Sequence, residues 1–177
     1  MKTPILNINC LPSIEEMKKI SQGLALLDAI LMPDWEYRYF SFNNNWDGEQ
    51  EEMIASMKDG AGMEYFIHFT DEGVAGKVFD NQKLIDAQAS LMQMPSCFSS
   101  FKNEAAFSIA NATFFFWREK NGNWTASPED LHSYALLGFL VDGVEGYHRW
   151  AEDYYERKIN FQALKDVFDS LAITEDQ

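Results

Sequence analysis

The sequence has few positive charges. Its 14 lysines and arginines stand against 28 aspartates and glutamates, which leaves a net charge of −14. Nucleic acids and anionic membranes are bound through clustered basic side chains, so neither is expected as a partner. The acidic excess is concentrated in residues 35–80, with 10 acids and 3 bases, and in residues 127–177, with 11 acids and 4 bases. Such regions favour either plain solvation or attraction of a basic protein.

Cysteines and long apolar runs are also scarce. The two cysteines, Cys10 and Cys97, lie far apart in the sequence and without metal-type spacing, which is typical of reduced thiols in a cytosolic protein. No apolar run approaches the ~20 residues of a membrane span, and the residues before Pro12 lack the apolar segment of a signal peptide. We therefore expect a cytoplasmic protein.

Histidine is rare, and the three histidines, His68, His132 and His148, lie in no recognisable catalytic motif. The acidic residues that could ligate a metal lack the spacing of a calcium loop. These metal-ligand candidates are Asp47, Glu49, Glu51, Glu52, Asp59, Glu64 and His68. Residues 58–62 contain two glycines but not the ending of a phosphate loop, so a tight turn is favoured. We expect no cofactor and no metal, and the sequence identifies no catalytic residue.

Aromatic residues make up 15% of the chain and mark its strands. Tyr37–Phe42 carries aromatic side chains on both faces, which predicts a central strand. Glu51–Met57 fits either a strand or a helix, and a strand is favoured because its neighbours are strands. Met63–Thr70 and Val74–Phe79 flank a short loop ending in glycine, which predicts a hairpin. Residues 35–80 are therefore expected to form a four-stranded antiparallel meander.

Helical patterns flank this meander. Ser13 and Glu16 have the spacing of a capping box, and the helix that they begin should end before Pro33. Asp28 falls within the apolar second half of that helix, where a hydrogen-bonded carboxylate is expected. Three further helices are predicted at the C-terminal end, beginning at Ser127, Val144 and Asn160.

The segment between the meander and these last helices is less regular. Lys83–Gln93 predicts a modest helix, and residues 101–109 one or two helical turns. Ala112–Arg118 contains four consecutive aromatic residues, which indicate a strand covered on both faces or an oligomer interface. A brief return strand should follow near Trp124.

These elements predict a single α+β domain over residues 1–177. It contains an antiparallel sheet of about five strands, a long N-terminal helix and a C-terminal group of three helices. Polar and aromatic side chains near the loops of the meander form the best candidate binding surface. This surface comprises Arg38, Trp46, Asp47, Ser56, Lys58, Asp59, Gly60, Glu64 and His68.

Most of this sequence resembles a known family, most specifically in its first half. Residues 36–43, Trp46 and residues 53–66 are similar to a family of bacterial cytoplasmic proteins of uncharacterised activity, and a weaker similarity continues in residues 107–118 and 150–156. The resemblance implies a bacterial cytoplasmic protein. It implies no activity, cofactor or catalytic residue.

Three classes of function remain. The first is a non-catalytic acidic binding protein, of immunity or inhibitor type, that recognises a basic protein surface. The second is a small-ligand-binding protein or enzyme with a polar pocket near Arg38, Trp46, Asp59, Glu64 and His68. The third is a structural protein that forms oligomers through Phe114–Trp117. The oligomeric state is left open, a homodimer included.

Overall fold

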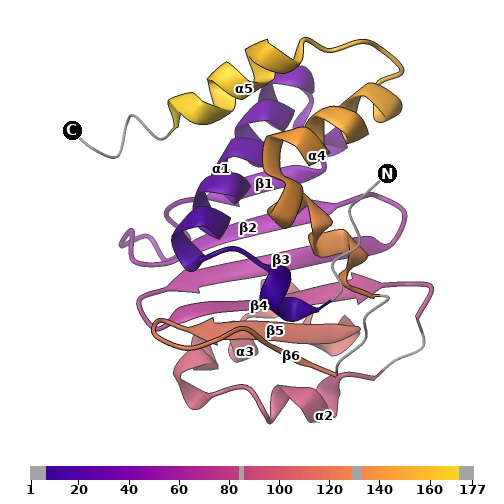
Figure 1. Cartoon of the computed structure of the whole chain (residues 1–177). Helices are drawn as coiled ribbons and strands as arrows, with labels where there is room; N and C mark the ends of the chain where they lie inside the picture. Colours follow the sequence, from indigo (N-terminus) through magenta and orange to yellow (C-terminus); the bar gives the residue numbers. More distant parts are fainter. Residues whose placement is uncertain (1–6, 84–85, 129–132, 172–177) are drawn as a thin grey trace.

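One antiparallel sheet of six strands lies at the centre of the structure, a computed structural model that describes residues 7–83, 86–128 and 133–171 (Figure 1). Each strand pairs with the one before it, so the sheet is a simple meander. The strands are β1 (Phe40–Asn43), β2 (Met53–Lys58), β3 (Met63–Thr70), β4 (Gly73–Asp80), β5 (Phe114–Glu119) and β6 (Thr125–Ser127). The α+β class is confirmed, with one strand more than the five expected.

The meander of residues 35–80 is confirmed except at its first strand. The segment Glu51–Met57 is a strand, as favoured, because β2 occupies most of it. β3 and β4 form the predicted hairpin. Residues Trp35–Tyr37 form a 3₁₀ turn instead of strand, and β1 begins only at Phe40. β1 lies at the edge of the sheet, so the prediction of a central strand is wrong. Its aromatic side chains are covered instead by helices that pack beside the edge.

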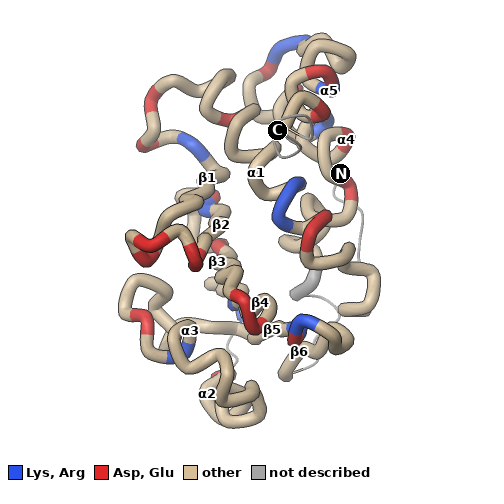
Figure 2. Tube along the Cα trace, turned by 90° about the vertical axis from the view of Figure 1, so that its left-hand side faces the viewer, with Lys and Arg blue, Asp and Glu red and all other residues tan. Residues whose placement is uncertain are grey.

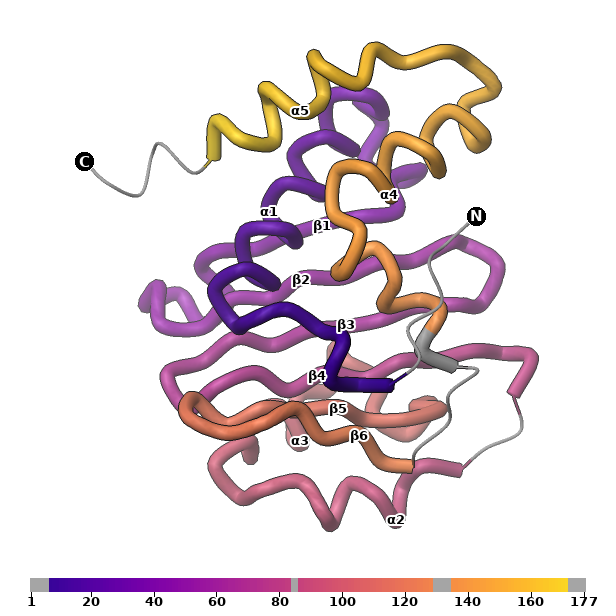
Figure 3. Tube along the Cα trace, in the orientation of Figure 1, coloured from indigo at the N-terminus to yellow at the C-terminus, as the bar shows by residue number. Residues whose placement is uncertain are grey.

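Two helices cover one face of the sheet and a third packs on them, as Figures 1 and 3 show. They are α1 (Ile14–Leu31), α4 (Gly138–Tyr154) and α5 (Phe161–Ser170), and α5 rests on α1 and α4. The predicted capping box of Ser13 and Glu16 is present at the start of α1. Asn160 caps α5 as predicted, by accepting a hydrogen bond from the Ala163 N–H at 2.9 Å.

Short helices cover the other face, seen below the sheet in Figure 1 and on its left in the lower half of Figure 2. They are α2 (Gln88–Leu91), α3 (Ser99–Asn103) and the 3₁₀ turns Ser96–Phe98, Ala105–Phe107 and Ile109–Asn111. The predicted helix Lys83–Gln93 is reduced to α2, and residues 84–85 lie outside the described residues. The aromatic run of β5 alternates between the two faces, because Phe114 and Phe116 join one core and Phe115 and Trp117 the other. All four are buried, so the core interpretation is confirmed.

The C-terminal helices differ from the prediction at their start. Ser127 does not begin a helix, because it ends β6 by pairing with Phe115. Residues 129–132, with His132, lie outside the described residues, and a 3₁₀ turn at Ser133–Leu137 leads into α4. The predicted break at Gly143 is present as a kink within α4, where φ is +54° and ψ is −130°. Among the helices of the described ranges, none combines the length and apolarity that crossing a membrane requires.

Candidate functional site

Four of the nine predicted binding residues line a single groove. Arg38, Ser56, Lys58 and Gly60 border an open depression of about 920 Å³ that runs along β1, with residues 22–29 of α1 on its other side. Ligand pockets usually measure about 300–1,000 Å³, so the groove could hold a sizeable molecule.

The polar groups of this groove are largely committed to the fold. The Arg38 guanidinium donates to the carbonyl oxygens of Met32 and Pro33, at 2.7 Å each. The hydroxyl oxygens of Ser41 and Ser56 lie 2.6 Å apart across β1 and β2. The Lys58 ammonium lies 4.9 Å from the centre of the Phe66 ring. The groove therefore contains hydrogen-bonding and aromatic groups but no arrangement of nucleophile and base among the described residues.

Asp59 stabilises the turn between β2 and β3. Its carboxylate accepts hydrogen bonds from the backbone N–H groups of Ala61 at 2.7 Å and Met63 at 2.9 Å. Gly60 has φ +70°, a left-handed conformation that glycine adopts without strain. The tight turn favoured from the sequence is thus present.

Glu64, His68 and Trp46 lie on the face of the sheet that the short helices cover. Glu64 accepts a hydrogen bond of 2.9 Å from Lys77, whose side chain is fully buried. Burial lowers the pKa of the Lys77 ammonium, and the neighbouring Glu64 offsets part of that effect. Lys77 also donates to the carbonyl oxygen of Ser108 at 3.1 Å. Its ammonium group is therefore held by hydrogen bonds within the fold.

His68 is bound to a glutamate that the sequence analysis did not pair with it. Its Nε2 lies 2.8 Å from a carboxylate oxygen of Glu52, and its ring is only 2% exposed. Phe107 packs against His68 and also stacks on Trp46, at centroid distances of 5.5 and 6.1 Å. A base that is buried in this way is out of reach of a substrate in the described structure.

Acidic side chains gather where β2 begins and the β3–β4 hairpin turns. We call this group the acidic end; it comprises Asp47, Glu49, Glu51, Glu52, Asp71 and Glu72. Four of its members, Glu51, Glu52, Asp71 and Glu72, line one hollow of about 180 Å³. Figure 2 shows red, acidic stretches of the chain in the β1–β2 connection, beside β2 and β3.

Two other observations define the chemistry of the acidic end. Asp47, Glu49 and Glu51 are exposed, and their carboxylate oxygens lie within 4.8 Å of one another, close enough to share a metal ion. Cys97 also borders the hollow. Burial and the nearby Glu119 and Glu72 raise the pKa of its thiol. A thiol with a raised pKa is a poor nucleophile.

A buried carboxylate joins α1 to β1 and α4, as the apolar surroundings of Asp28 predicted. Asp28 accepts hydrogen bonds from the N–H groups of Tyr39 at 2.7 Å and Phe40 at 3.0 Å. The hydroxyls of Tyr147 and Tyr155 donate to its other oxygen, at 2.9 and 3.2 Å. Burial and the adjacent Asp28 raise the pKa of both tyrosines. This site is structural, because its carboxylate is inaccessible.

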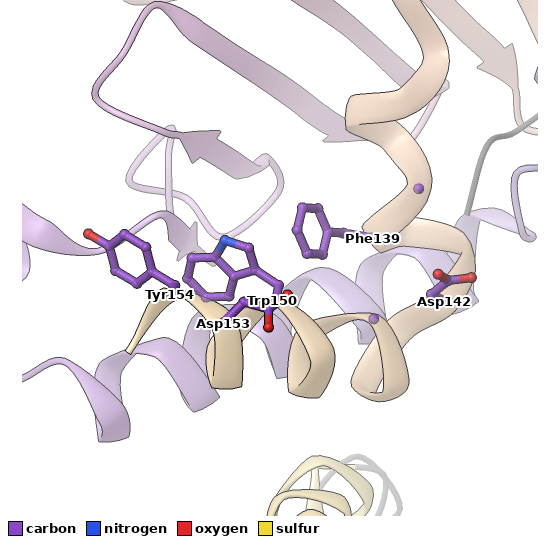
Figure 4. Close-up of a pocket in the computed structure, with 7 residues that line it drawn as sticks. Phe139, Asp142, Trp150, Asp153 and Tyr154 are labelled. Carbon is purple, nitrogen blue, oxygen red and sulfur yellow. The ribbon is translucent and has the colours of Figure 1, made fainter. Parts of the chain in front are cut away.

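A third cavity, which the sequence analysis missed, lies in the bend of α4. This α4 pocket measures about 380 Å³ and is lined by Gly138, Phe139, Asp142, Gly146, Trp150, Asp153 and Tyr154. Figure 4 shows Trp150 between Tyr154 and Phe139, with Asp153 beside it. The spacing of glycines, aromatic residues and aspartates in residues 138–154 was the available signal, but the sequence does not show that a kink makes them converge.

Comparisons of the chain with protein-family models, with curated proteins and with solved structures find no match. The family resemblance of residues 36–66 therefore stays a prediction. Function has to be inferred from the groove, the acidic end and the α4 pocket.

Proposed function

We propose that the protein is a non-catalytic acidic binding protein of immunity or inhibitor type, which recognises a basic protein surface in the cytoplasm. The observation that carries this proposal is the acidic end, where two loops distant in sequence bring carboxylates to one hollow. Clustered charge of one sign accelerates association with a partner of the opposite sign and orients the encounter.

The state of the reactive side chains supports a non-catalytic role. His68 and Lys77 are buried against glutamates, and Cys97 carries a raised pKa. Among the described residues, no nucleophile, base and orienting group converge on a cavity, which is the arrangement that covalent catalysis requires. The net charge of −14 favours a partner with a basic surface.

The proposal is tested by neutralising the acidic end. A triple variant, Glu49→Gln, Glu51→Gln and Glu72→Gln, removes three exposed charges there. The matched control, Asp34→Asn, Glu145→Gln and Glu156→Gln, removes three exposed charges elsewhere. Immobilised wild-type protein is used to capture a basic protein from source-cell extract at low salt, and the purified partner is then titrated calorimetrically at increasing salt.

We expect the acidic-end variant to bind the partner about tenfold more weakly and to lose most of the salt dependence, because each exposed charge pair contributes about 0.2–1 kcal/mol. The control variant should bind within about threefold of wild type, since its charges act only at long range. Equal affinity of the two variants, or no basic protein retained at low salt, would contradict the proposal.

A second function is favoured by the groove along β1. Its volume of about 920 Å³ and its mixed polar and aromatic lining fit a small-ligand-binding protein. Of the five residues first assigned to such a pocket, only Arg38 lines the groove. Ser56→Val removes a central hydroxyl while keeping the strand, so a ligand found by thermal-shift screening should lose affinity in this variant if the groove binds it. An unchanged affinity would remove this alternative.

A further inference from the structure

We infer that the α4 pocket binds a guanidinium group, and that this group is an arginine side chain of the basic partner. The inference rests on the proposed function for the identity of the partner. It rests on the α4 pocket itself for the chemistry of the ligand.

The kink in α4 creates the cavity. Gly143 has φ +54° and ψ −130°, so residues 138–142 turn away from the axis of residues 144–154. The two segments approach closely, because a Cβ atom on Gly146 would lie 2.6 Å from the Cβ of Asp142. The cavity of about 380 Å³ therefore opens inside a bend that the neighbouring helices hold in place.

Aromatic rings form one side of this pocket. The rings of Trp150 and Tyr154 are nearly parallel, at 12° and a centroid distance of 5.1 Å, and Phe139 meets Trp150 edge-on at 6.1 Å (Figure 4). Trp150 is anchored from behind by contacts with Phe40 and Tyr147, at 5.5 and 5.3 Å. Rigid aromatic faces attract cations through their negative ring electrons, and indole does so most strongly.

Two carboxylates complete the lining. Asp153 is exposed, and it makes no hydrogen bond or ion pair with the described part of the chain. Asp142 already receives a guanidinium, because an Arg149 nitrogen lies 2.6 Å from one of its oxygens. The pocket therefore offers a negative charge at Asp153 beside the flat indole of Trp150. Its other carboxylate, Asp142, already binds a guanidinium group, that of Arg149.

Arginine fits these features better than lysine does. A guanidinium is planar and weakly hydrated, so it can stack on the indole while its edge donates to a carboxylate. An ammonium is compact and strongly hydrated, and loses more on entering a cavity lined mainly by apolar atoms. The net charge of −14 adds a long-range attraction for any basic protein that carries such a side chain.

The test uses N-acetyl-arginine amide as the probe and its neutral isostere, N-acetyl-citrulline amide, as the ligand control. Binding is followed by the indole N–H resonance of Trp150 in two-dimensional NMR spectra. Asp153→Asn removes the Asp153 charge and leaves Asp142 in place; Asp153 is exposed, so the fold should be unaffected. Glu145→Gln makes the same change in charge on the same helix at an exposed residue outside the pocket.

We expect the arginine probe to shift the Trp150 resonance saturably and the citrulline probe to leave it in place. Asp153→Asn should weaken binding of the arginine probe about three- to fivefold, and Glu145→Gln by less than about 1.5-fold. No saturable shift, an equal response to citrulline, or wild-type affinity in Asp153→Asn would overturn the inference.

The purified partner separates this inference from the proposed function. If the acidic-end variant loses the partner and Asp153→Asn binds it as wild type does, the proposed function stands and the pocket does not hold the partner's arginine. If the arginine probe binds but no basic protein is retained at low salt, the proposed function fails and the guanidinium site remains.

Discussion

The two faces of the sheet bury ionisable groups in different ways. Beneath α1 and α4, Asp28 is surrounded by four neutral donors from the backbone of residues 39–40 and from two tyrosines. Beneath the short helices, Lys77 and His68 each meet one glutamate, and those glutamates are 23% and 27% exposed. The first arrangement isolates a charge from water, whereas the second leaves one member of each pair partly solvated.

This difference predicts where the structure is most sensitive. A buried charge loses its hydration, and only hydrogen bonds of good geometry compensate for that loss. Removing Asp28 would leave donors from β1 and α4 without an acceptor, so several elements would be affected together. Removing one glutamate from the other face would affect one side chain that water can partly reach.

The largest effect is expected for Asp28→Ala. We predict a loss of about 3–5 kcal/mol in the free energy of unfolding, because the hydroxyls of Tyr147 and Tyr155 and two backbone N–H groups lose their acceptor. Urea denaturation measures this loss. Asp34→Ala, at an exposed aspartate, is the control and should change stability by less than about 0.5 kcal/mol. A loss below about 1 kcal/mol for Asp28→Ala would show that the two faces do not differ in their sensitivity to loss of a buried carboxylate.

The second prediction concerns the buried lysine. Glu64→Gln leaves the Lys77 ammonium without a carboxylate and should cost about 2–3 kcal/mol. Lys77→Met fills the same space with an apolar chain and leaves Glu64 to be solvated, so its cost should be below about 1.5 kcal/mol. Both are measured by urea denaturation. If Lys77→Met cost more than Glu64→Gln, the attraction between Lys77 and Glu64 would control stability here, rather than the desolvation of the lysine.

Local signals in the sequence predicted much of this framework. The capping box of Ser13 and Glu16 and the β3–β4 hairpin depend on neighbouring residues, and both are present. Asp28 was recognised as a hydrogen-bonded aspartate, but its partner Tyr147 is 119 residues away, so no local pattern could identify it.

The sites were less predictable than the framework. Polar residues near the meander were expected to form one surface, yet Glu64 and His68 face a core while Arg38 and Ser56 line the groove. Strand register puts Ser56 on the same face of the sheet as Glu64 and His68, because Ser56 pairs with Phe66. The difference is one of position: Ser56 lies beside the edge strand β1, whereas Phe107 packs over His68. β1 begins three residues later than expected, and the Asp28 carboxylate accepts from the N–H groups of Tyr39 and Phe40 at its start.

The third prediction uses pH to examine the Asp28 face. Burial and Asp28 raise the pKa of the Tyr147 hydroxyl above its ordinary value of 10.0. The folded state therefore keeps this proton more tightly than the unfolded state, so the stabilisation is complete below pH 10 and is lost as the pH rises above it. Tyr147→Phe should cost about 1 kcal/mol at neutral pH, and its difference from wild type should shrink above pH ~10.

Urea denaturation at neutral and alkaline pH measures this difference. Tyr37→Phe changes a ring that is 61% exposed and serves as the control, with stability equal to wild type throughout. A difference between wild type and Tyr147→Phe that grows with pH would contradict the assigned direction of the pKa shift.

The smallest effect is expected for Glu52→Gln. The Glu52 side chain is 27% exposed, so water already stabilises part of its charge, and an amide can still hydrogen-bond the His68 Nε2. We predict a loss below about 1 kcal/mol, measured by urea denaturation beside Glu51→Gln, an exposed neighbour with the same change in charge. A loss above about 2 kcal/mol would mean that His68 depends on Glu52 as the tyrosines depend on Asp28. Partial exposure of Glu52 would then not reduce the cost of removing its charge. Any difference in sensitivity between the two faces would have to arise from packing alone.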